Sequence, residues 1–196
     1  MPSLVDPVLT PDQLSKADQP TLAAGPILLR PWRAGDADAL VAAYAEPEIQ
    51  RWHVRSMTHS EAEQWIEAAG RSWAEGAGVS WAVEQEGVFA GRMTLKFYVS
   101  DAYAGVGYWT RRAARGQGIA PRALDAAAQW AFEAGFHRVE LEHSTLNPAS
   151  CRVALKAGFG PEGTRRSAAL HADGWHDMHF HARIAGSGLL VTPSAV

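Results

Sequence analysis

Residues 108–120 read Tyr-Trp-Thr-Arg-Arg-Ala-Ala-Arg-Gly-Gln-Gly-Ile-Ala, the most informative stretch of the sequence. An apolar strand runs into an Arg-Gly-Gln-Gly turn, and the turn opens a helical pattern that continues to Ala134. Two glycines let the backbone curl tightly and present successive N–H groups. The start of the helix adds unpaired donors and the positive end of the helix dipole. The segment therefore predicts a binding site for a pyrophosphate, to which Arg115 adds a charged donor.

Two common phosphate-binding loops do not fit this stretch. A P-loop requires GxxxxGK[ST], which the chain lacks, and a dinucleotide fingerprint requires a third glycine where Pro121 stands. Taken alone, Gly116 and Gly118 would also fit an ordinary tight turn. The ligand must therefore be identified from the rest of the sequence.

The hydrophobic periodicity around this stretch predicts a mixed α/β (α+β) chain. A capping-box pattern at Thr58–Glu61 and the pair Asn147-Pro148 predict two helix starts, and Asp36 is expected to cap a third helix. The order of elements predicts a mixed, mostly antiparallel central sheet flanked by helices. We expect strands near 27–32, 81–83, 89–99, 103–110, 137–144, 159–170 and 175–184, and helices near 36–46, 58–73, 118–134 and 147–158.

Bulk composition restricts the function classes. The 196 residues suit one domain, expected at 26–186, with an N-terminal tail or arm at 1–25 and a C-terminal tail at 187–196. A net charge of −3 argues against nucleic-acid binding. The single cysteine excludes an internal disulfide and favours a reducing compartment. Since we find neither a signal peptide nor an apolar run that would span a bilayer, we expect a cytoplasmic protein without a membrane partner.

The opening stretch and a second segment each resemble a motif of a known family. Arg115–Ala120 resembles motif A of the GNAT superfamily of acyl-CoA-dependent N-acyltransferases. Asn147–Ser150, Val153–Phe159 and Glu162-Gly163 resemble its motif B, in the form found in the branch of ribosomal-protein N-terminal acetyltransferases. Asp173–Asp177 also resembles that branch. The resemblance covers roughly residues 27–185.

The resemblance implies a GNAT fold and acetyl-CoA as the acyl donor. A primary amine would attack the thioester directly in a ternary complex. In the family, the amides of the turn bind the pyrophosphate, and the backbone of the preceding strand pairs with the pantetheine arm. The residues expected to contact coenzyme A are Tyr108, Trp109, Thr110, Arg115, Gly116, Gln117, Gly118, Ile119, Ala120, Asn147 and Ser150.

The catalytic residues are less fully specified by the motifs. A backbone N–H near Trp109 or Thr110 is the expected donor to the oxyanion. Many family members protonate the thiolate with a tyrosine, but Ala154 stands at that position, so Ser150 becomes the candidate; it also fits a residue that caps the first helical turn. Glu142 or His143 is the candidate base, and at most one serves because adjacent strand residues point to opposite faces. His143 also fits a core histidine.

The acceptor side is expected to include Trp52 and His53, in what the sequence suggests is a loop between two helices. His53 or a water chain could then replace the strand residues as the base. No metal is expected: His171, His176, His179 and His181 cluster near the C-terminus, but without a neighbouring cysteine or a fixed ligand spacing.

The acceptor itself stays open between three kinds of amine: a protein N-terminus, a small metabolite and an amino-bearing antibiotic. A catalytically silent acyl-CoA-binding regulator is the alternative function. The family often pairs, which makes a homodimer one possible assembly.

Overall fold

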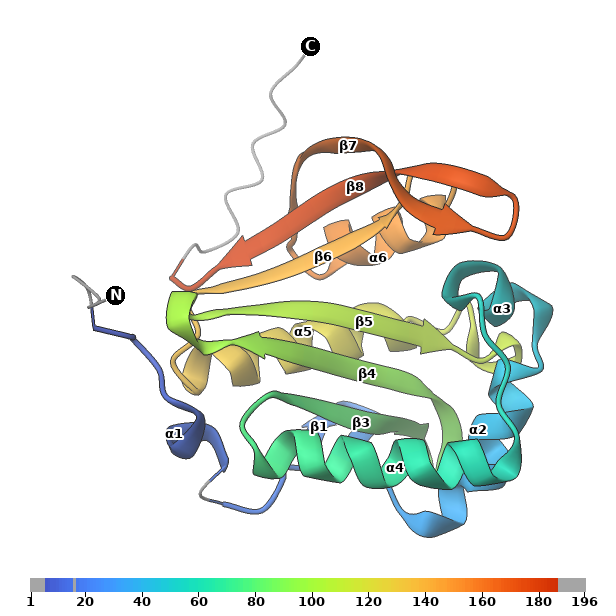
Figure 1. Cartoon of the computed structure of the whole chain (residues 1–196), viewed down its shortest axis with the longest axis horizontal. Helices are drawn as coiled ribbons and strands as arrows, with labels where there is room; N and C mark the ends of the chain where they lie inside the picture. The colour runs from blue at the N-terminus through green and yellow to red at the C-terminus, as the bar shows by residue number, and fades with distance from the viewer. Residues whose placement is uncertain (1–5, 16, 187–196) are drawn as a thin grey trace.

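The computed structural model describes residues 6–15 and 17–186, which form an eight-stranded sheet with six helices (Figure 1). The strand order is β1-β2-β3-β4-β5-β6-β8-β7, and only the β5–β6 pair is parallel within the described residues. The strands are β1 (Leu22–Ala24), β2 (Ile27–Pro31), β3 (Gly78–Gln85), β4 (Val88–Tyr98), β5 (Tyr103–Thr110), β6 (Arg138–Ser144), β7 (Gly160–His171) and β8 (Gly174–Ile184). The predicted mixed, mostly antiparallel sheet is confirmed.

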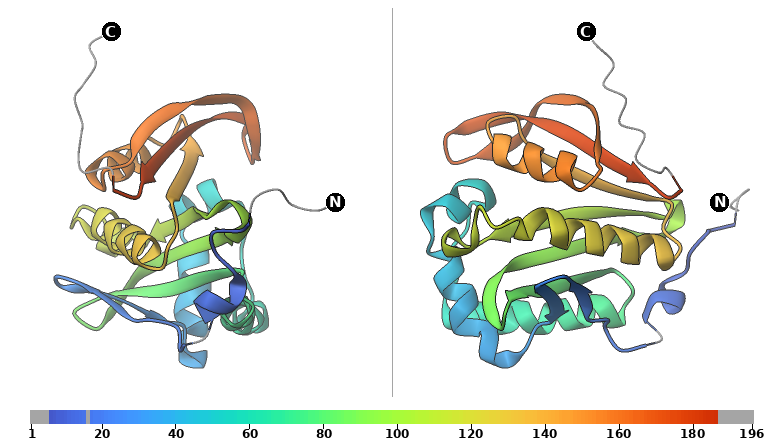
Figure 2. Two further views of the ribbon diagram at one scale, coloured as in Figure 1. Left: turned by 90° about the vertical axis from the view of Figure 1, so that its left-hand side faces the viewer. Right: turned by 180° about the vertical axis from the view of Figure 1, so that it is seen from behind.

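The helices form a layer on each side of the sheet. They are α1 (Pro11–Ser15), α2 (Ala37–Tyr44), α3 (Pro47–His53), α4 (His59–Ala74), α5 (Ile119–Glu133) and α6 (Pro148–Lys156). In Figure 2, α5 and α6 lie on the face opposite α4. Within the described residues, no helix is long and apolar enough to cross a membrane.

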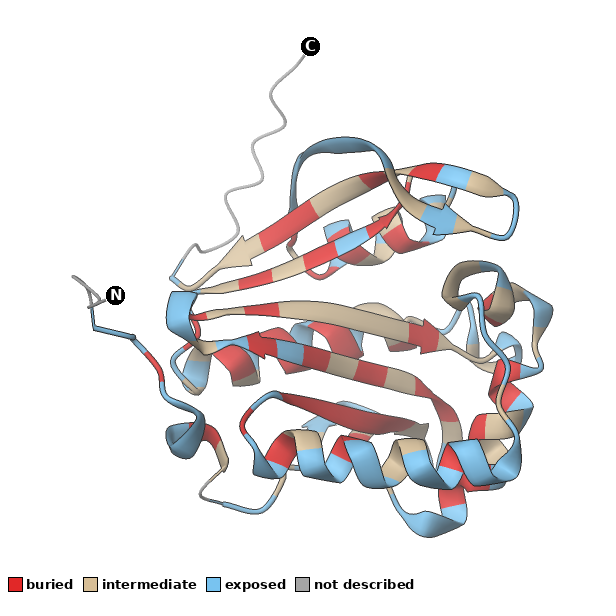
Figure 3. Cartoon of the chain, viewed as in Figure 1, coloured by how far each residue is buried: buried red, intermediate tan, exposed pale blue. Residues whose placement is uncertain are grey.

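Burial follows the two periodicities that the sequence displays. Along β4 and β6, buried positions alternate with positions that are half-buried or exposed, while α5 buries one stripe against the sheet (Figure 3). That stripe includes Ala123, Leu124, Ala127 and Ala131, each no more than 1% exposed, and its small side chains let α5 lie close to the strands. The resulting core fixes the start of α5, which carries the phosphate-binding turn.

Two of the three predicted caps are present. Thr58 and Glu61 form the reciprocal capping box of α4, and the Asn147 side chain accepts a hydrogen bond from the Ser150 amide at the start of α6. Asp36 does not cap α2 with its side chain, contrary to expectation. Its carboxylate is instead bound by both terminal nitrogens of Arg30, at 2.7 and 2.8 Å, because a buried arginine requires that partner.

Helix α3 is not indicated by the sequence pattern. Glu46-Pro47 reads as the end of a helix followed by a loop, whereas Pro47 occupies the first position of a new helix, where its missing N–H costs nothing. The helix ends when Val54 enters the left-handed region at φ 47°. Trp52 and His53 therefore lie on the last turn of a helix and not in a loop.

The N-terminal segment packs on the domain over the part that the structure describes. Leu9 and Leu14 are 6% and 7% exposed and belong to the main core. The indole N–H groups of Trp73 and Trp81 donate to the carbonyls of Ala17 and Pro20. This segment is therefore an arm held by core tryptophans, and β1 adds a strand that the sequence does not indicate. Residues 187–196, expected to be a tail, lie outside the described residues.

The parallel pair β5–β6 is short. Its register runs only from Tyr103↔Arg138 to Val106↔Leu141. Beyond Val106, β5 continues along β4 and β6 continues along β8, so the two strands part. Figure 1 shows their ribbons diverging towards the end of the sheet where α3 lies.

Candidate active site

A cavity of about 440 Å³ lies where β5 and β6 part. Four segments supply its walls: α3, the end of β5, the turn that opens α5, and α6. Most of the expected coenzyme-contacting residues line it, and the structure therefore brings both sequence motifs to one place. From that set the lining residues are Tyr108, Trp109, Thr110, Arg115, Gly116, Gly118, Ile119, Ala120, Asn147 and Ser150.

The turn before α5 presents unpaired backbone donors. Gly116 and Gly118 have φ of +77° and +73°, a conformation that favours glycine. The N–H groups of Ala114 and Arg115 bond back within the turn, and the next bonded N–H of the helix start is that of Arg122. Among the described residues, the amides from Gly116 to Ala120 therefore have no backbone acceptor, as an anion site at a helix N-terminus requires.

Two side chains brace this turn. The Arg115 Nε donates to the Thr110 carbonyl at 3.0 Å, and the exposed guanidinium borders the cavity. Gln117 points elsewhere: its amide donates to the Ala113 carbonyl at 3.1 Å, and it does not line the cavity. Gln117 therefore supports the shape of the turn, while Arg115 can add charge to a bound phosphate.

The edge of β5 determines which backbone groups face the gap. The Tyr108 and Thr110 carbonyls accept from His53 and Arg115, so their peptide groups point away from β4. The Trp109 carbonyl lies against Gly91 of β4. Because the N–H and C=O of one strand residue point to the same edge, Thr110 and not Trp109 has its N–H on the open side. The Trp109 indole is buried and donates to the Tyr44 hydroxyl.

A pair of hydroxyl groups spans the cavity between β5 and α6. The Tyr108 phenol lies 2.8 Å from the Ser150 Oγ, and Ser150 is 9% exposed. Burial raises the pKa of Tyr108 to about 12, although the Ser150 hydrogen bond opposes the shift. The phenol is therefore protonated at any physiological pH. The motif assigns only the backbone of Tyr108 a role. The sequence signal for a side-chain role is the presence of a phenol near the end of the strand that precedes the glycine turn.

His53 reaches the same strand from the opposite wall. Its Nε2 lies 3.2 Å from the Tyr108 carbonyl, which makes Nε2 the protonated nitrogen and leaves a lone pair on Nδ1. Burial, and then the charge of Arg92, lower the pKa of His53 to about 4. Trp52 lines the cavity beside it and packs against His171 and His176, at ring-centroid distances of 6.0 and 6.4 Å.

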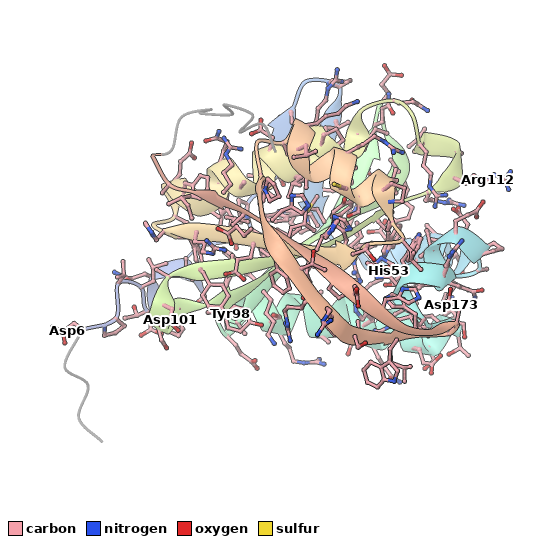
Figure 4. The ribbon with its side chains drawn as sticks, turned by 90° about the horizontal axis from the view of Figure 1, so that it is seen from above. Asp6, His53, Tyr98, Asp101, Arg112 and Asp173 are labelled. Carbon is pink, nitrogen blue, oxygen red and sulfur yellow. The ribbon has the colours of Figure 1, made fainter. Side chains whose placement is uncertain are left out.

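The β7–β8 hairpin reaches α3 through these two histidines. In Figure 4, His53 and Asp173 lie at the same end of the molecule, far from Tyr98 and Asp101. Asp173 bonds the His176 Nε2 at 2.8 Å, and the Ser144 Oγ bonds its Nδ1 at 2.8 Å. The hairpin therefore buttresses the wall that carries Trp52.

Glu142 and His143, the predicted base candidates, do not line the cavity. Glu142 is exposed on the other face of β6, with its carboxylate 3.8 Å from Arg165. His143 is 5% exposed and bonds the Ser144 carbonyl and His181. The structure thus groups His53, Tyr108 and Ser150 around the cavity and leaves both strand candidates outside it.

Arg92 is a further residue that the motifs do not single out. Its Nη1 donates to the Tyr44 hydroxyl at 2.8 Å, and its guanidinium lies against the rings of Trp65 and Trp109. Its Nε is buried without a hydrogen-bond partner, and burial lowers its pKa. Within the described ranges no carboxylate lies within ion-pair distance of Arg92. In the sequence, Arg92 is one of the polar residues that alternate along β4 with Thr94 and Lys96, so nothing in that pattern singles it out.

Known proteins share this architecture. The sequence profile of the acetyltransferase (GNAT) domain matches residues 27–160, more than half of the chain. The chain belongs to the GNAT acetyltransferase family. A ribosomal-protein-serine acetyltransferase of Escherichia coli (strain K12) is 35% identical over 85 residues, which cover 43% of this chain and 48% of that relative. The aligned region of this GNAT chain thus spans about half the length of the curated relative.

Solved structures of acetyltransferases superpose over most of the chain. A ribosomal L7/L12 alpha-N-protein acetyltransferase in complex with coenzyme A matches with a TM-score of 0.80 and 20% identity, over 86% of this chain and 100% of that one. A ribosomal-protein-S5-alanine acetyltransferase from Vibrio fischeri matches with a TM-score of 0.78 and 17% identity, over 86% and 98%. These likenesses establish the fold.

Proposed function

We propose that the protein is an acetyl-CoA-dependent N-acetyltransferase whose acceptor is the N-terminal amine of a peptide that carries a nearby carboxylate. The observation that carries the proposal is the cavity itself. It joins the unpaired amides of the glycine turn to a buried Tyr108–Ser150 pair and to the neutral His53. The similar proteins include a ribosomal-protein-serine acetyltransferase and an alpha-N-protein acetyltransferase, which supports a peptide acceptor.

The donor fits the residues present. The amides of 116–120 and the Arg115 guanidinium supply positive potential for phosphates, and the open edge of β5 offers the Thr110 N–H. A Cβ atom added at Gly116 or Gly118 would meet no atom within 4 Å, so the ligand side of the turn is clear. When bound, acetyl-CoA supplies an activated acetyl group as a thioester.

The residues around the cavity divide the chemistry between them. The new C–N bond forms as the C–S bond breaks, the amine loses a proton, and the leaving sulfur gains one. The Nδ1 of His53 accepts a hydrogen bond from the amine and orients it; with a pKa of about 4 it is too weak a base to retain the proton, which passes to water. The Tyr108 phenol, through Ser150, donates a proton to the sulfur, and the phenolate regains a proton from water.

Arg92 suggests the chemistry of the acceptor. A half-buried arginine without a carboxylate partner is costly, and its charge lies close enough to His53 to lower the pKa of that ring. Arg92 does not itself line the cavity, but its charge acts on His53, which does. An acceptor carboxylate bound beside His53 would be stabilised by that charge, close to the amine. An acidic residue close to a peptide N-terminus places both groups on one substrate.

The first experiment measures thiol release from acetyl-CoA with peptides that have acidic, neutral or basic second and third residues, and with polyamines, aminoglycosides and amino acids. We expect turnover with acidic peptides. Arg92→Met should raise KM for those peptides by about tenfold or more, and leave the neutral peptides unchanged. Arg71→Met, which changes an exposed arginine of α4, is the matched control.

Other outcomes would replace the proposal. Release only with a small amine would identify a metabolic or detoxifying enzyme. Acetyl-CoA binding without release from any acceptor would identify the silent regulator. A cytoplasmic location and a homodimer remain predictions. Size-exclusion chromatography with light scattering tests the homodimer.

A further inference from the structure

A cluster of three histidines and the single cysteine lies outside the cavity, between α6 and the sheet. His143 on β6 faces His179 on β8, His181 follows two residues along β8, and Cys151 on α6 covers them. One nitrogen from each ring and the sulfur all lie within 4.8 Å of one another. We propose that His143, Cys151, His179 and His181 form a tetrahedral Zn²⁺ site.

The spacing suits zinc. With Zn–N bonds of about 2.0–2.1 Å and a Zn–S bond of about 2.3 Å, tetrahedral ligands are separated by about 3.3–3.6 Å. The Nε2 atoms of His143 and His181 are already 3.2 Å apart. The ligand atoms lie at most 4.8 Å apart, so the other pairs need to approach by up to about 1.2–1.5 Å, which small side-chain rotations can supply.

The hydrogen bonds leave the correct atoms free. The His143 Nδ1 lies 2.8 Å from the Ser144 carbonyl, so Nδ1 carries the hydrogen and Nε2 presents its lone pair to the cluster. This is the outer hydrogen bond that metal-bound histidines use to fix their orientation. The His181 ring is 2% exposed and its Nδ1 has no hydrogen-bond partner, although the Phe159 backbone is near enough to raise its pKa.

The facing ring nitrogens agree with the same assignment, since the Nε2 atoms of His143 and His181 lie 3.2 Å apart. Two neutral rings with facing Nε2 atoms can share only one hydrogen between them. A cation between the rings would satisfy both nitrogens at once.

The site would be structural. Four protein ligands leave no open position, and none of the four lines the cavity. The cation would tie α6 to β6 and β8 and so hold Ser150, the neighbour of Cys151, in place. The sequence, in which no cysteine lies near the histidines, predicts no metal; the fold brings Cys151 to them from a different element.

The test uses the full chain without a histidine tag. Metal analysis of the purified protein and titration of the chelated protein with Zn²⁺ should give one bound ion per chain. Substitution with Co²⁺ should produce visible ligand-field bands and a near-ultraviolet thiolate charge-transfer band. Cys151→Ser should abolish the thiolate band, and His179→Asn, which changes the most accessible histidine of the cluster, should weaken Zn²⁺ binding more than about tenfold.

His171→Gln is the matched control, because His171 belongs to the same hairpin but lies outside the cluster. It should bind Zn²⁺ and Co²⁺ as the unaltered protein does. Substoichiometric metal together with a Co²⁺ spectrum that lacks the thiolate band would overturn the proposal. So would equal Zn²⁺ affinity in the Cys151→Ser, His179→Asn and His171→Gln proteins. Neither outcome depends on acetyl transfer.

Discussion

Replacing Tyr108 with phenylalanine removes a single oxygen from the wall of the cavity. The ring would keep its place, while the Ser150 Oγ would lose a partner at 2.8 Å. Because the pKa of Tyr108 is about 12, the phenol carries its proton throughout the usable pH range. If this proton reaches the leaving sulfur, Tyr108→Phe must slow the transfer at every pH.

The size of the effect follows from the chemistry of the leaving group. General acids contribute roughly 10²- to 10⁴-fold to rates. A thiol has a pKa near 8.5, so its thiolate leaves with moderate help, and the lower end applies. We expect kcat to fall about 100-fold, equivalent to about 2.7 kcal/mol, with little change in KM because the proton is needed only in the transfer.

The assay is thiol release at saturating acetyl-CoA for Tyr108→Phe, Ser150→Ala and the double variant. Since the two hydroxyls act in series, the double variant should be no slower than the slower single variant. Tyr103→Phe, on the same strand but stacked on Tyr98, should retain full activity. A Tyr108→Phe enzyme within twofold of the unaltered kcat would refute the reasoning.

Three other substitutions test the turn, the cavity histidine and the core ion pairs. Gly118→Ala places a side chain at φ +73°, a backbone conformation that costs an alanine about 1–2 kcal/mol. The turn should therefore shift away from this conformation and bind coenzyme A more weakly, as measured by calorimetry, whereas Gly70→Ala in α4 should bind it normally. His53 has a pKa of about 4 in the folded protein and near 6.5 in the unfolded chain, so the unfolded chain binds more protons and stability falls as pH drops from 6.5 to 4. His53→Gln should lessen the fall in Tm over this range, and parallel curves of Tm against pH for the two proteins would contradict the prediction. Arg30→Met leaves two carboxylates in the core without their cation and should destabilise by about 3–5 kcal/mol in urea unfolding, against almost nothing for Arg71→Met.

Most of the sheet is predictable from the sequence because its signals are local. Alternating side chains mark β4 and β6, and the caps at Thr58 and Asn147 mark two helix starts. Pro47 is ambiguous because the same residue disfavours helix before it and starts a helix after it. The arm at residues 6–15 and 17–25 lacks a period because it is held at separate points, by the burial of Leu9 and Leu14 and by two indole N–H groups from elsewhere in the chain.

The site residues also differ in how far they can be predicted from the sequence. The glycine turn is contiguous, so its residues are predictable from the motif. The pairing of Tyr108 with Ser150 joins positions 42 residues apart, and the contact of His53 with the Tyr108 carbonyl joins positions 55 apart. Such partners depend on how β5 and β6 part. Neither periodicity nor composition reports where two strands separate.

The short β5–β6 pairing also makes the middle of the sheet its most weakly connected part. Four register pairs join β1–β5 to β6–β8, and the cavity opens directly beyond them. Its walls come from both halves, β5 and the start of α5 on one and α6 on the other. A ligand that contacts both walls links the two halves of the sheet, and its binding raises the free energy of unfolding of the whole domain. Without a ligand, local opening of the domain should therefore be concentrated between β5 and β6. A bound donor would stabilise the fold as well as supply the acyl group.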